Sequence, residues 1–316
     1  MRFYRPTGTS GNVHPFCSSF SKRSRALLLL LVPLFAMAQT SYTWNGSLNG
    51  AWNNAANWTP STGFPLAADH ATIVAAGTMP ILDMARSVTN LTVSSGSLDL
   101  AGFTLTHTGN GSFSGGAVNN GTLSPNTAAG STTFSGTTFG AAVSGTSAIL
   151  LFNGSVFNAP VAMTKTGGAN DYSTGNNTFN GTATFTVTNG RLYLNNTGID
   201  TFNGNVVLNS TGASNGVWLG QSSGSASLAN GRTISTGTYS AGSLLFRNFT
   251  QVGSTPQVLL LSLGGTLYFQ SGSTFNGDVT SSSPGLYLNG ATFNGTATFT
   301  KTRSEERRVG KECRLT

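Results

Sequence analysis

An exact internal repeat constrains this sequence more than any other feature. The nine-residue string TFNGTATFT runs from Thr178 to Thr186 and recurs unchanged from Thr292 to Thr300. Five steps of roughly 23 residues would span this separation, and such a period is typical of solenoids, in which each repeat forms one turn of a coil. One turn cannot bury its apolar residues alone, so neighbouring turns must stack on it. We therefore expect most of the chain to form one coil.

Two series of residues keep this period. Phenylalanine followed by Asn or Ser forms the first series: Phe134, Phe157, Phe179, Phe202, Phe275 and Phe293. Two weaker repeats are expected near Leu228 and Phe249. The second series consists of apolar or aromatic residues in short alternating segments: Leu151, Tyr172, Tyr193, Trp218, Leu245, Tyr268 and Tyr287. We predict that both series are structural anchors, one per turn.

The repeated string predicts the geometry of one turn. Phe179 should point inward, and Asn180-Gly181 should form a bend, since both residue types tolerate left-handed backbone angles. Ala183 and Phe185 should then point inward while the alternating threonines point outward. The predicted fold is all-β: a single-stranded parallel β-helix, or solenoid, with about 22–25 residues per coil. It should be right-handed, because parallel crossovers nearly always are.

The repeats also suggest how the chain is divided. Residues 81–130 should form irregular first coils and residues 131–302 the regular repeats. A β-sandwich built from hairpins is the alternative fold, but it would not explain the constant period.

The two ends differ in composition from the rest. Residues 1–38 are expected to be a signal peptide, since Lys22, Arg23 and Arg25 precede an apolar run of ten residues, 26–35. The small residues of Ala36-Met37-Ala38 fit a cleavage site that leaves Gln39 first. At the other end, residues 303–314 read RSEERRVGKECR and resemble the translation of a sequencing adapter. We therefore expect the tail 303–316 not to be native and the sequence to be a fragment of a longer protein.

Removing both ends changes the charge balance. The whole chain carries a formal net charge of +7. Residues 39–302 contain six Lys or Arg and six Asp, with no Glu and no Cys. The remaining segment is neutral, so nucleic-acid binding has no electrostatic basis. Without cysteine, packing and backbone pairing alone must hold the fold.

The opening segment, 39–80, is rich in tryptophan. Trp44, Trp52 and Asn57-Trp58 are followed by Pro65, Asp69 and Ile73. This pattern resembles the start of large, repetitive bacterial surface proteins and adhesins. The resemblance implies a cell-surface protein and a missing C-terminal translocator or sorting domain.

The tryptophans allow two interpretations. The open end of a solenoid needs a cover, so Trp44, Trp52 and Trp58 should mainly form the core of an N-terminal cap. Alternatively, they and Trp218 could be stacking positions for carbohydrate, since aromatic faces serve both purposes.

Groups able to do chemistry are few. Asp69-His70 is the one adjacent ionisable pair in residues 39–302, and a turn in the cap explains it more simply. Asp171 and Asp200 lie a little over one turn apart and could approach each other, as a polysaccharide hydrolase requires, although turn positions are the simpler explanation. No cofactor or metal site is predicted.

The sequence therefore predicts an exported surface or extracellular β-solenoid with a structural or adhesive role. Its expected partners are polysaccharides or a neighbouring cell surface, and no membrane-spanning segment is expected after residue 38. A polysaccharide-binding or polysaccharide-degrading β-helix is the alternative, and we do not expect an enzyme.

The signal-peptide prediction can be tested by expressing the full chain in a bacterial host. The exported product should begin at Gln39 when its N-terminus is sequenced. Leu29→Arg should block processing, because a charge interrupts the apolar run. Ser19→Arg adds the same charge outside that run and should be processed normally. An unprocessed wild-type chain would contradict the prediction.

Overall fold

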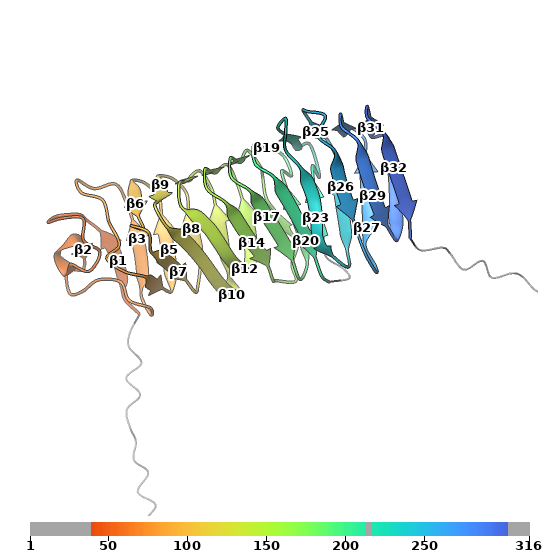
Figure 1. Cartoon of the computed structure of the whole chain (residues 1–316). Coiled ribbons are helices and arrows are strands. Elements are labelled where there is room, and N and C mark those ends of the chain that lie inside the picture. The colour runs from red at the N-terminus through yellow and green to blue at the C-terminus, as the bar shows by residue number, and fades with distance from the viewer. Residues whose placement is uncertain (1–38, 213–215, 303–316) are drawn as a thin grey trace, which may run out of the picture. The chain divides into compact units, whose positions relative to one another are not determined.

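The computed structural model describes residues 39–212 and 216–302, so the predicted signal peptide and tail lie outside the described residues. The described part is almost entirely β-structure, with one short 3-10 helix, η1 (Ala55–Asn57). Its strands wind into a parallel β-solenoid of about 11 turns, which confirms the predicted fold class (Figure 1). Stacked turns are separated by the usual strand spacing, so the stack is about 50 Å long.

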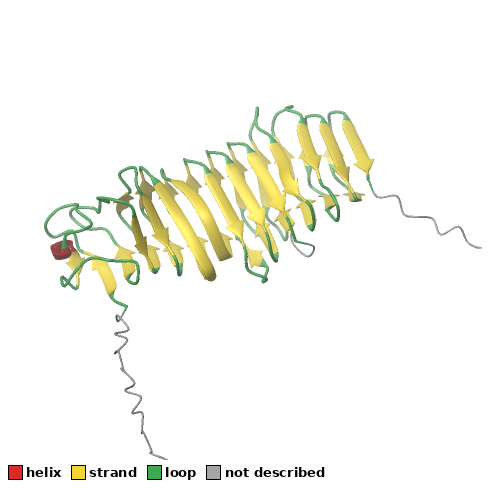
Figure 2. Cartoon of the chain, turned by 60° about the horizontal axis from the view of Figure 1, so that its bottom comes forward, coloured by secondary structure: helices red, strands yellow, loops and turns green. Residues whose placement is uncertain are grey.

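Three sheets run along the solenoid within the described residues (Figure 2). The sixteen-stranded sheet contains β1 (Ser41–Trp44), β2 (Trp58–Thr59), β3 (His70–Ile73), β4 (Arg86–Val88), β5 (Asn90–Val93), β7 (Thr104–His107), β8 (Gly111–Phe113), β10 (Thr122–Phe134), β12 (Ala142–Phe152), β14 (Val161–Lys165), β17 (Ala183–Val187), β20 (Val206–Ser210), β23 (Ile234–Tyr239), β26 (Gln257–Leu260), β29 (Val279–Ser283) and β32 (Ala297–Lys301).

The other two sheets are shorter. The ten-stranded sheet contains β6 (Ser97–Asp99), β9 (Ala117–Asn119), β11 (Thr138–Phe139), β13 (Val156–Phe157), β16 (Thr178–Phe179), β19 (Ile199–Phe202), β22 (Ser225–Leu228), β25 (Phe249–Gln251), β28 (Thr274–Phe275) and β31 (Thr292–Phe293). The six-stranded sheet contains β15 (Asp171–Tyr172), β18 (Arg191–Leu194), β21 (Gly216–Leu219), β24 (Ser243–Phe246), β27 (Thr266–Gln270) and β30 (Gly285–Asn289).

The strands pair with their equivalents one turn away. β14 lies parallel to β17, for example, and β17 in turn lies parallel to β20. Among the described strand pairs only β1 and β2 are antiparallel, at the N-terminal cap. Hairpin strands would be antiparallel throughout, so the β-sandwich alternative is excluded.

Phenylalanine rings fill the interior. Phe139, Phe157, Phe179 and Phe202 stack with centroid distances of 5.0 Å between successive rings. That distance is close to the strand spacing, so each ring lies directly over its equivalent in the next turn. Each of these side chains is fully buried.

The register corrects one of the predicted anchors. Phe134 lies in β10, where it pairs with Phe113 and Phe152, and it is Phe139 that pairs with Phe157. The regular spacing from Phe134 to Phe157 was therefore coincidental. The predicted repeat at Leu228 is confirmed, since Leu228 pairs with Phe202.

The repeat expected near Phe249 is present as β25, and its inward position opposite Leu228 is taken by Gln251. Gln251 occupies the position that pairs with Leu228, while Phe249 pairs with Ala226. The buried Gln251 amide is satisfied there, because it donates to the Thr255 carbonyl at 2.5 Å and accepts from the Gly277 N–H at 3.3 Å. The remaining anchors, Phe275 and Phe293, pair with each other in β28 and β31.

The bend at Asn180-Gly181 forms for a different reason than predicted. Neither residue has a positive φ. A Cβ at Gly181 would lie 2.5 Å from the Ala159 carbonyl carbon, so glycine is needed because the preceding turn approaches closely. Asn180 instead joins a ladder of side-chain amides, accepting from Asn203 at 2.8 Å and donating to Asn158 at 2.7 Å.

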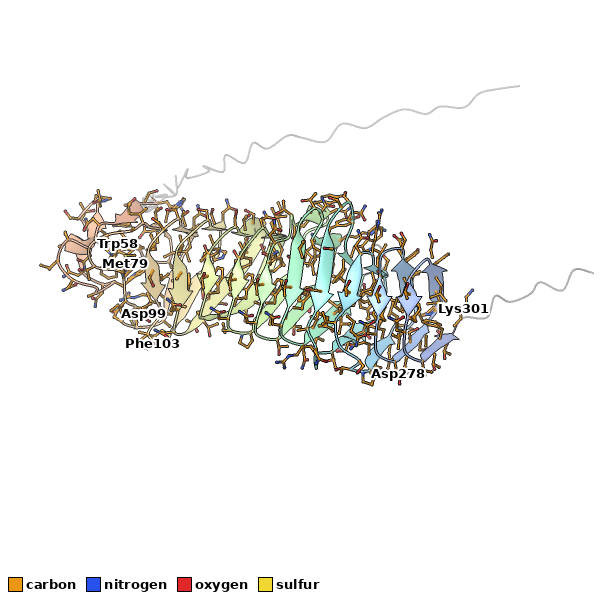
Figure 3. The ribbon with its side chains drawn as sticks, turned by 90° about the horizontal axis from the view of Figure 1, so that it is seen from above. Trp58, Met79, Asp99, Phe103, Asp278 and Lys301 are labelled. Atoms are coloured by element: carbon orange, nitrogen blue, oxygen red, sulfur yellow. The ribbon has the colours of Figure 1, made fainter. Side chains whose placement is uncertain are left out.

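The cap prediction is supported by the packing of the first turn. Trp44, Trp52 and Trp58 are 1%, 0% and 0% exposed, and the first two rings pack edge-on against Trp58. Trp58 lies among the first turns, whereas Asp278 and Lys301 lie among the last (Figure 3). Because these three rings are buried, no face is free to stack on a sugar.

Removing one ring from the phenylalanine stack should be costly. Phe179→Ala should lower the free energy of unfolding by about 3–5 kcal/mol, since it leaves a cavity between Phe157 and Phe202. Phe103→Ala is a control, because this ring lies outside the stack and is 38% exposed, and it should cost clearly less, on the order of 1 kcal/mol. Urea unfolding followed by circular dichroism measures both, and equal effects would contradict the inward stack.

A candidate binding face on the six-stranded sheet

The outer surface of the six-stranded sheet carries a row of aromatic side chains. The register from β15 to β30 aligns one residue per strand: Tyr172, Tyr193, Trp218, Leu245, Tyr268 and Tyr287. Their neighbours in sequence, such as Leu192 and Leu194, belong to the core. Successive side chains in a strand point to opposite faces, so the row points away from the core. Tyr193 and Leu245 are nevertheless buried, at 4% and 3% exposed, whereas the other four members are at least partly exposed. We call the outward-directed residues of this sheet the aromatic face.

The rings of the row are arranged in two ways. Tyr172 stacks on Tyr193 with a centroid distance of 4.4 Å, and Tyr268 stacks on Tyr287 at 4.8 Å. Trp218 instead meets Tyr193 edge-on, with an interplanar angle of 72°. Its indole N–H donates to the Ser243 hydroxyl at 2.6 Å, which holds the ring toward β24.

Arg191, in β18, packs its side chain against this row. Its guanidinium carbon lies 4.8 Å from the centre of the Trp218 ring, in a cation–π contact. Its Nε atom is buried and has no hydrogen-bond partner. In the described part of the chain, the only ion pairs are Arg86–Asp83 and Lys165–Asp171, so Arg191 has no carboxylate partner.

The charge on the aromatic face is positive. Arg191 is the charged side chain whose contact with Trp218 places it on this face. Among the described carboxylates, the one in this sheet is Asp171, and it is buried in the interior. The contacts of the described residues therefore place one guanidinium group, that of Arg191, on this face and no carboxylate.

The surroundings of the tyrosines shift their acidity. Burial raises the pKa of the Tyr193 hydroxyl, while the hydrogen bond from Arg191 opposes the shift. Burial also raises the pKa of Tyr268, and Tyr287 adds to this effect. Both hydroxyls are therefore neutral at physiological pH and can donate as well as accept hydrogen bonds.

The predicted site residues divide between the interior and this face. Trp218, Tyr193, Tyr268 and Tyr287 share the aromatic face, far along the chain from the buried tryptophans of the cap. Trp218 is the one proposed stacking position that is partly exposed. Arg191, which makes the cation–π contact with Trp218, was not among the predicted residues.

Two buried ionisable groups form an ion pair inside the solenoid. Lys165 Nζ lies 3.2 Å from Asp171 Oδ2, and both side chains are buried. Lys165 also donates to the Gly167 carbonyl at 2.6 Å, and Asp171 accepts from the Leu150 N–H at 2.8 Å. Burial raises the pKa of Asp171, whereas the Leu150 hydrogen bond and the Lys165 charge oppose this shift.

Asp200 lies in the ten-stranded sheet, apart from the sheet of Asp171. Its Oδ1 accepts from the Asn177 backbone N–H at 2.9 Å and from the Asn177 side chain at 2.8 Å. Its Oδ2 is buried without a hydrogen-bond partner. Burial raises the pKa of Asp200 to about 6, although its hydrogen bonds act in the opposite direction.

These positions are poorly suited to hydrolysis. Asp171 and Asp200 are 3% and 0% exposed, so a polysaccharide at the surface could not reach either carboxyl group. They are not surface-turn residues either, because both lie in strands and point into the interior.

The remaining candidates occupy the early turns. Asp69 Oδ2 accepts from the Leu66 N–H at 3.0 Å, as expected for a turn in the cap, and the His70 ring contacts Asn90. Among the described residues, no three His, Cys, Asp or Glu side chains lie close enough to hold a metal ion. No helix in the same residues is long and apolar enough to cross a membrane.

Comparisons with protein-family models, with curated proteins and with solved structures found no match to this chain. The aromatic face and the interior polar groups must therefore be interpreted from their own chemistry.

Asp200 should make stability depend on pH. Its pKa is about 6 in the folded protein and near 3.8 when unfolded, so the folded state binds more protons between these values. Its contribution to the free energy of unfolding therefore falls as the pH rises from 4 to 6. His107 acts oppositely, because burial lowers its pKa from 6.5 to about 4 and stability is lost as the pH falls.

Asp200→Asn should remove the first effect. The amide oxygen can replace Oδ1, and the NH2 group takes the position at which Oδ2 lacks a partner. Relative to wild type, the variant should gain on the order of 2 kcal/mol between pH 4 and pH 7. Denaturant unfolding across this range measures it, with Asp99→Asn at the partly exposed end of β6 as the control. A constant difference between variant and wild type would contradict the assignment.

Proposed function

We propose that this chain is an exported structural and adhesive β-solenoid, which holds a binding face at a fixed position on a cell surface. The observation that carries the proposal is the aromatic face itself. Six residues that point away from the core are aligned at strand spacing, and the four of them that reach the solvent are Tyr172, Trp218, Tyr268 and Tyr287. Aromatic residues are enriched at recognition surfaces because they combine apolar area with a polar group.

The scaffold suits such a role. Backbone hydrogen bonds link each turn to the next, and a continuous stack of buried rings supports the sheets from inside. A side chain fixed on this surface loses little conformational freedom when a ligand binds. The predicted signal peptide and the Trp-rich opening are consistent with a location outside the cell.

A polysaccharide-degrading enzyme is the competing function. Glycoside hydrolysis needs two carboxyl groups on either side of the bond that is broken. The two carboxyl groups that the sequence offered for this role, Asp171 and Asp200, are buried and belong to different sheets. These features favour binding without turnover.

The two functions can be separated by incubating the purified full chain with dextran, xylan and polygalacturonate. We expect no increase in reducing ends and no absorbance from unsaturated uronates over a prolonged incubation. Product release that is lost in Asp171→Asn or Asp200→Asn would overturn the structural and adhesive function. Product release that survives in both variants would indicate a contaminating enzyme, so these variants also serve as the control.

A further inference from the structure

We infer that the outward surface of the sixteen-stranded sheet binds ice, through hydroxyl and methyl groups whose spacing matches that of its water molecules. This function goes beyond the proposed one, because it uses a different sheet from the aromatic face and does not depend on it. We call the outward residues of β14, β17, β20, β26, β29 and β32 the threonine face. These strands follow one another along one side of the solenoid, with β23 between the first three and the last three (Figure 1).

The threonine face is a two-dimensional array. In β17, the outward Thr184 and Thr186 alternate with Ala183, Phe185 and Val187, which are buried. The parallel register aligns two such outward positions in each neighbouring strand. The first patch of the face, on β14, β17 and β20, consists of Ala162, Thr164, Thr184, Thr186, Val207 and Asn209.

A second patch repeats this arrangement on the last turns of the described chain. The register shifts between β20 and β23, which separates the two patches. The repeated string supplies one strand of each patch, β17 and β32. The second patch, on β26, β29 and β32, consists of Val258, Leu260, Thr280, Ser282, Thr298 and Thr300.

The threonine face contains no charged and no aromatic side chain. The charged residues of its six strands, Lys165 and Lys301, align with the inward positions of Val187 and Ser283, which are buried. The phenylalanines of these strands are on the inward side as well. An anionic ligand would need cationic partners, and a sugar is typically held by aromatic rings. A lattice of neutral water molecules needs neither.

The spacing of the face matches such a lattice. Adjacent strands lie about 4.8 Å apart, and outward positions within one strand repeat at about 6.8 Å. Water molecules joined tetrahedrally by hydrogen bonds of about 2.75 Å have second neighbours about 4.5 Å apart, and the lattice repeats at about 7.3 Å in the perpendicular direction. Each pair of distances agrees to within about a tenth, so one plane of ice can meet several side chains at once.

The side chains themselves suit an ordered ligand. The hydroxyls of Thr164, Thr184 and Thr280 have no hydrogen-bond partner within the described chain and lie at partly or fully exposed residues, so they are available to water. Branching at Cβ restricts χ1, so these side chains lose little freedom on binding. Val207 and Val258 have nearly the shape of threonine and keep the methyl groups aligned. A charged side chain would instead keep its own hydration shell.

The ten-stranded sheet also carries outward threonines, but in a single column. Thr178 and Thr201 are aligned there, beside the ladder of Asn158, Asn180 and Asn203. The amides of that ladder are hydrogen-bonded to one another, so this sheet offers no second column of free hydroxyls. It therefore provides control positions of the same residue type.

The experiment partitions the purified full chain between slowly growing ice and the remaining liquid. We expect the chain to be enriched in the ice, whereas serum albumin, the reference protein, should be excluded from it. Thr184→Lys should lower the enrichment about twofold, because it disrupts one patch of two. Combining it with Thr298→Lys should lower the enrichment about tenfold or more, because both patches are then disrupted.

The matched control makes the same two changes on the ten-stranded sheet. Thr201 and Thr292 are outward residues of β19 and β31, so Thr201→Lys combined with Thr292→Lys adds the same charge and should change the enrichment by less than about twofold. Thermal unfolding of every variant checks that the fold is retained.

Several results would overturn the inference. Exclusion of the wild-type chain from ice is one, and equal losses in the two double variants is another. Binding to microcrystalline cellulose in unfrozen buffer that is lost in the Thr184→Lys and Thr298→Lys double variant would assign the face to a neutral polysaccharide instead. A dimer in sedimentation that the same double variant dissociates would assign it to a second copy of the chain.

Discussion

Parallel pairing of each strand with its equivalent one turn away is the constraint on which the rest of the structure depends. It places like residues over like residues, and phenylalanine rings then stack at the spacing that the backbone sets. The same register aligns the amide ladder of Asn158, Asn180 and Asn203 on the outside. One backbone relation therefore generates both the core and the surface rows.

This constraint also explains how polar groups are tolerated in the interior. Buried polar groups are costly unless they are hydrogen-bonded, and the narrow coil places backbone carbonyls and N–H groups within their reach. Lys165 and Asp171 use the backbone of the preceding turn in this way. Asp200 Oδ1 has hydrogen-bond partners and its buried Oδ2 has none. Burial raises its pKa, and its hydrogen bonds only partly offset this effect.

The fold could be predicted because the same residue types recur once per turn. The candidate site depends on residues that occur in one turn only, so the repeat does not reveal it. The prediction that Phe179, Ala183 and Phe185 point inward is confirmed, because all three side chains are buried. The bend at Asn180-Gly181 was assigned the wrong cause, because contact between neighbouring turns cannot be seen in one repeat.

The alternation of side chains could have revealed more. Lys165 follows Val161 and Met163 at inward positions of β14, and Asp200 lies two residues before the inward Phe202. Asp171, which pairs with Lys165, and Asp200 were instead interpreted as turn residues. The contact between Arg191 and Trp218 was beyond prediction, since it joins outward positions of adjacent strands and leaves no periodic signal.

The two identical strings occupy the same position in the coil, and this bears on how such a chain can change its length. Phe179 lies between Phe157 and Phe202, and Phe293 stacks on Phe275, so each copy meets the same kind of neighbour. A whole turn inserted or deleted among such repeats preserves every ring contact on either side of it. The turn that contains Lys165 and Asp171 is different, because its charges require one another and the backbone of the turn before. Growth by duplication is therefore compatible with the regular turns, and the charged turn marks a point that must be kept whole.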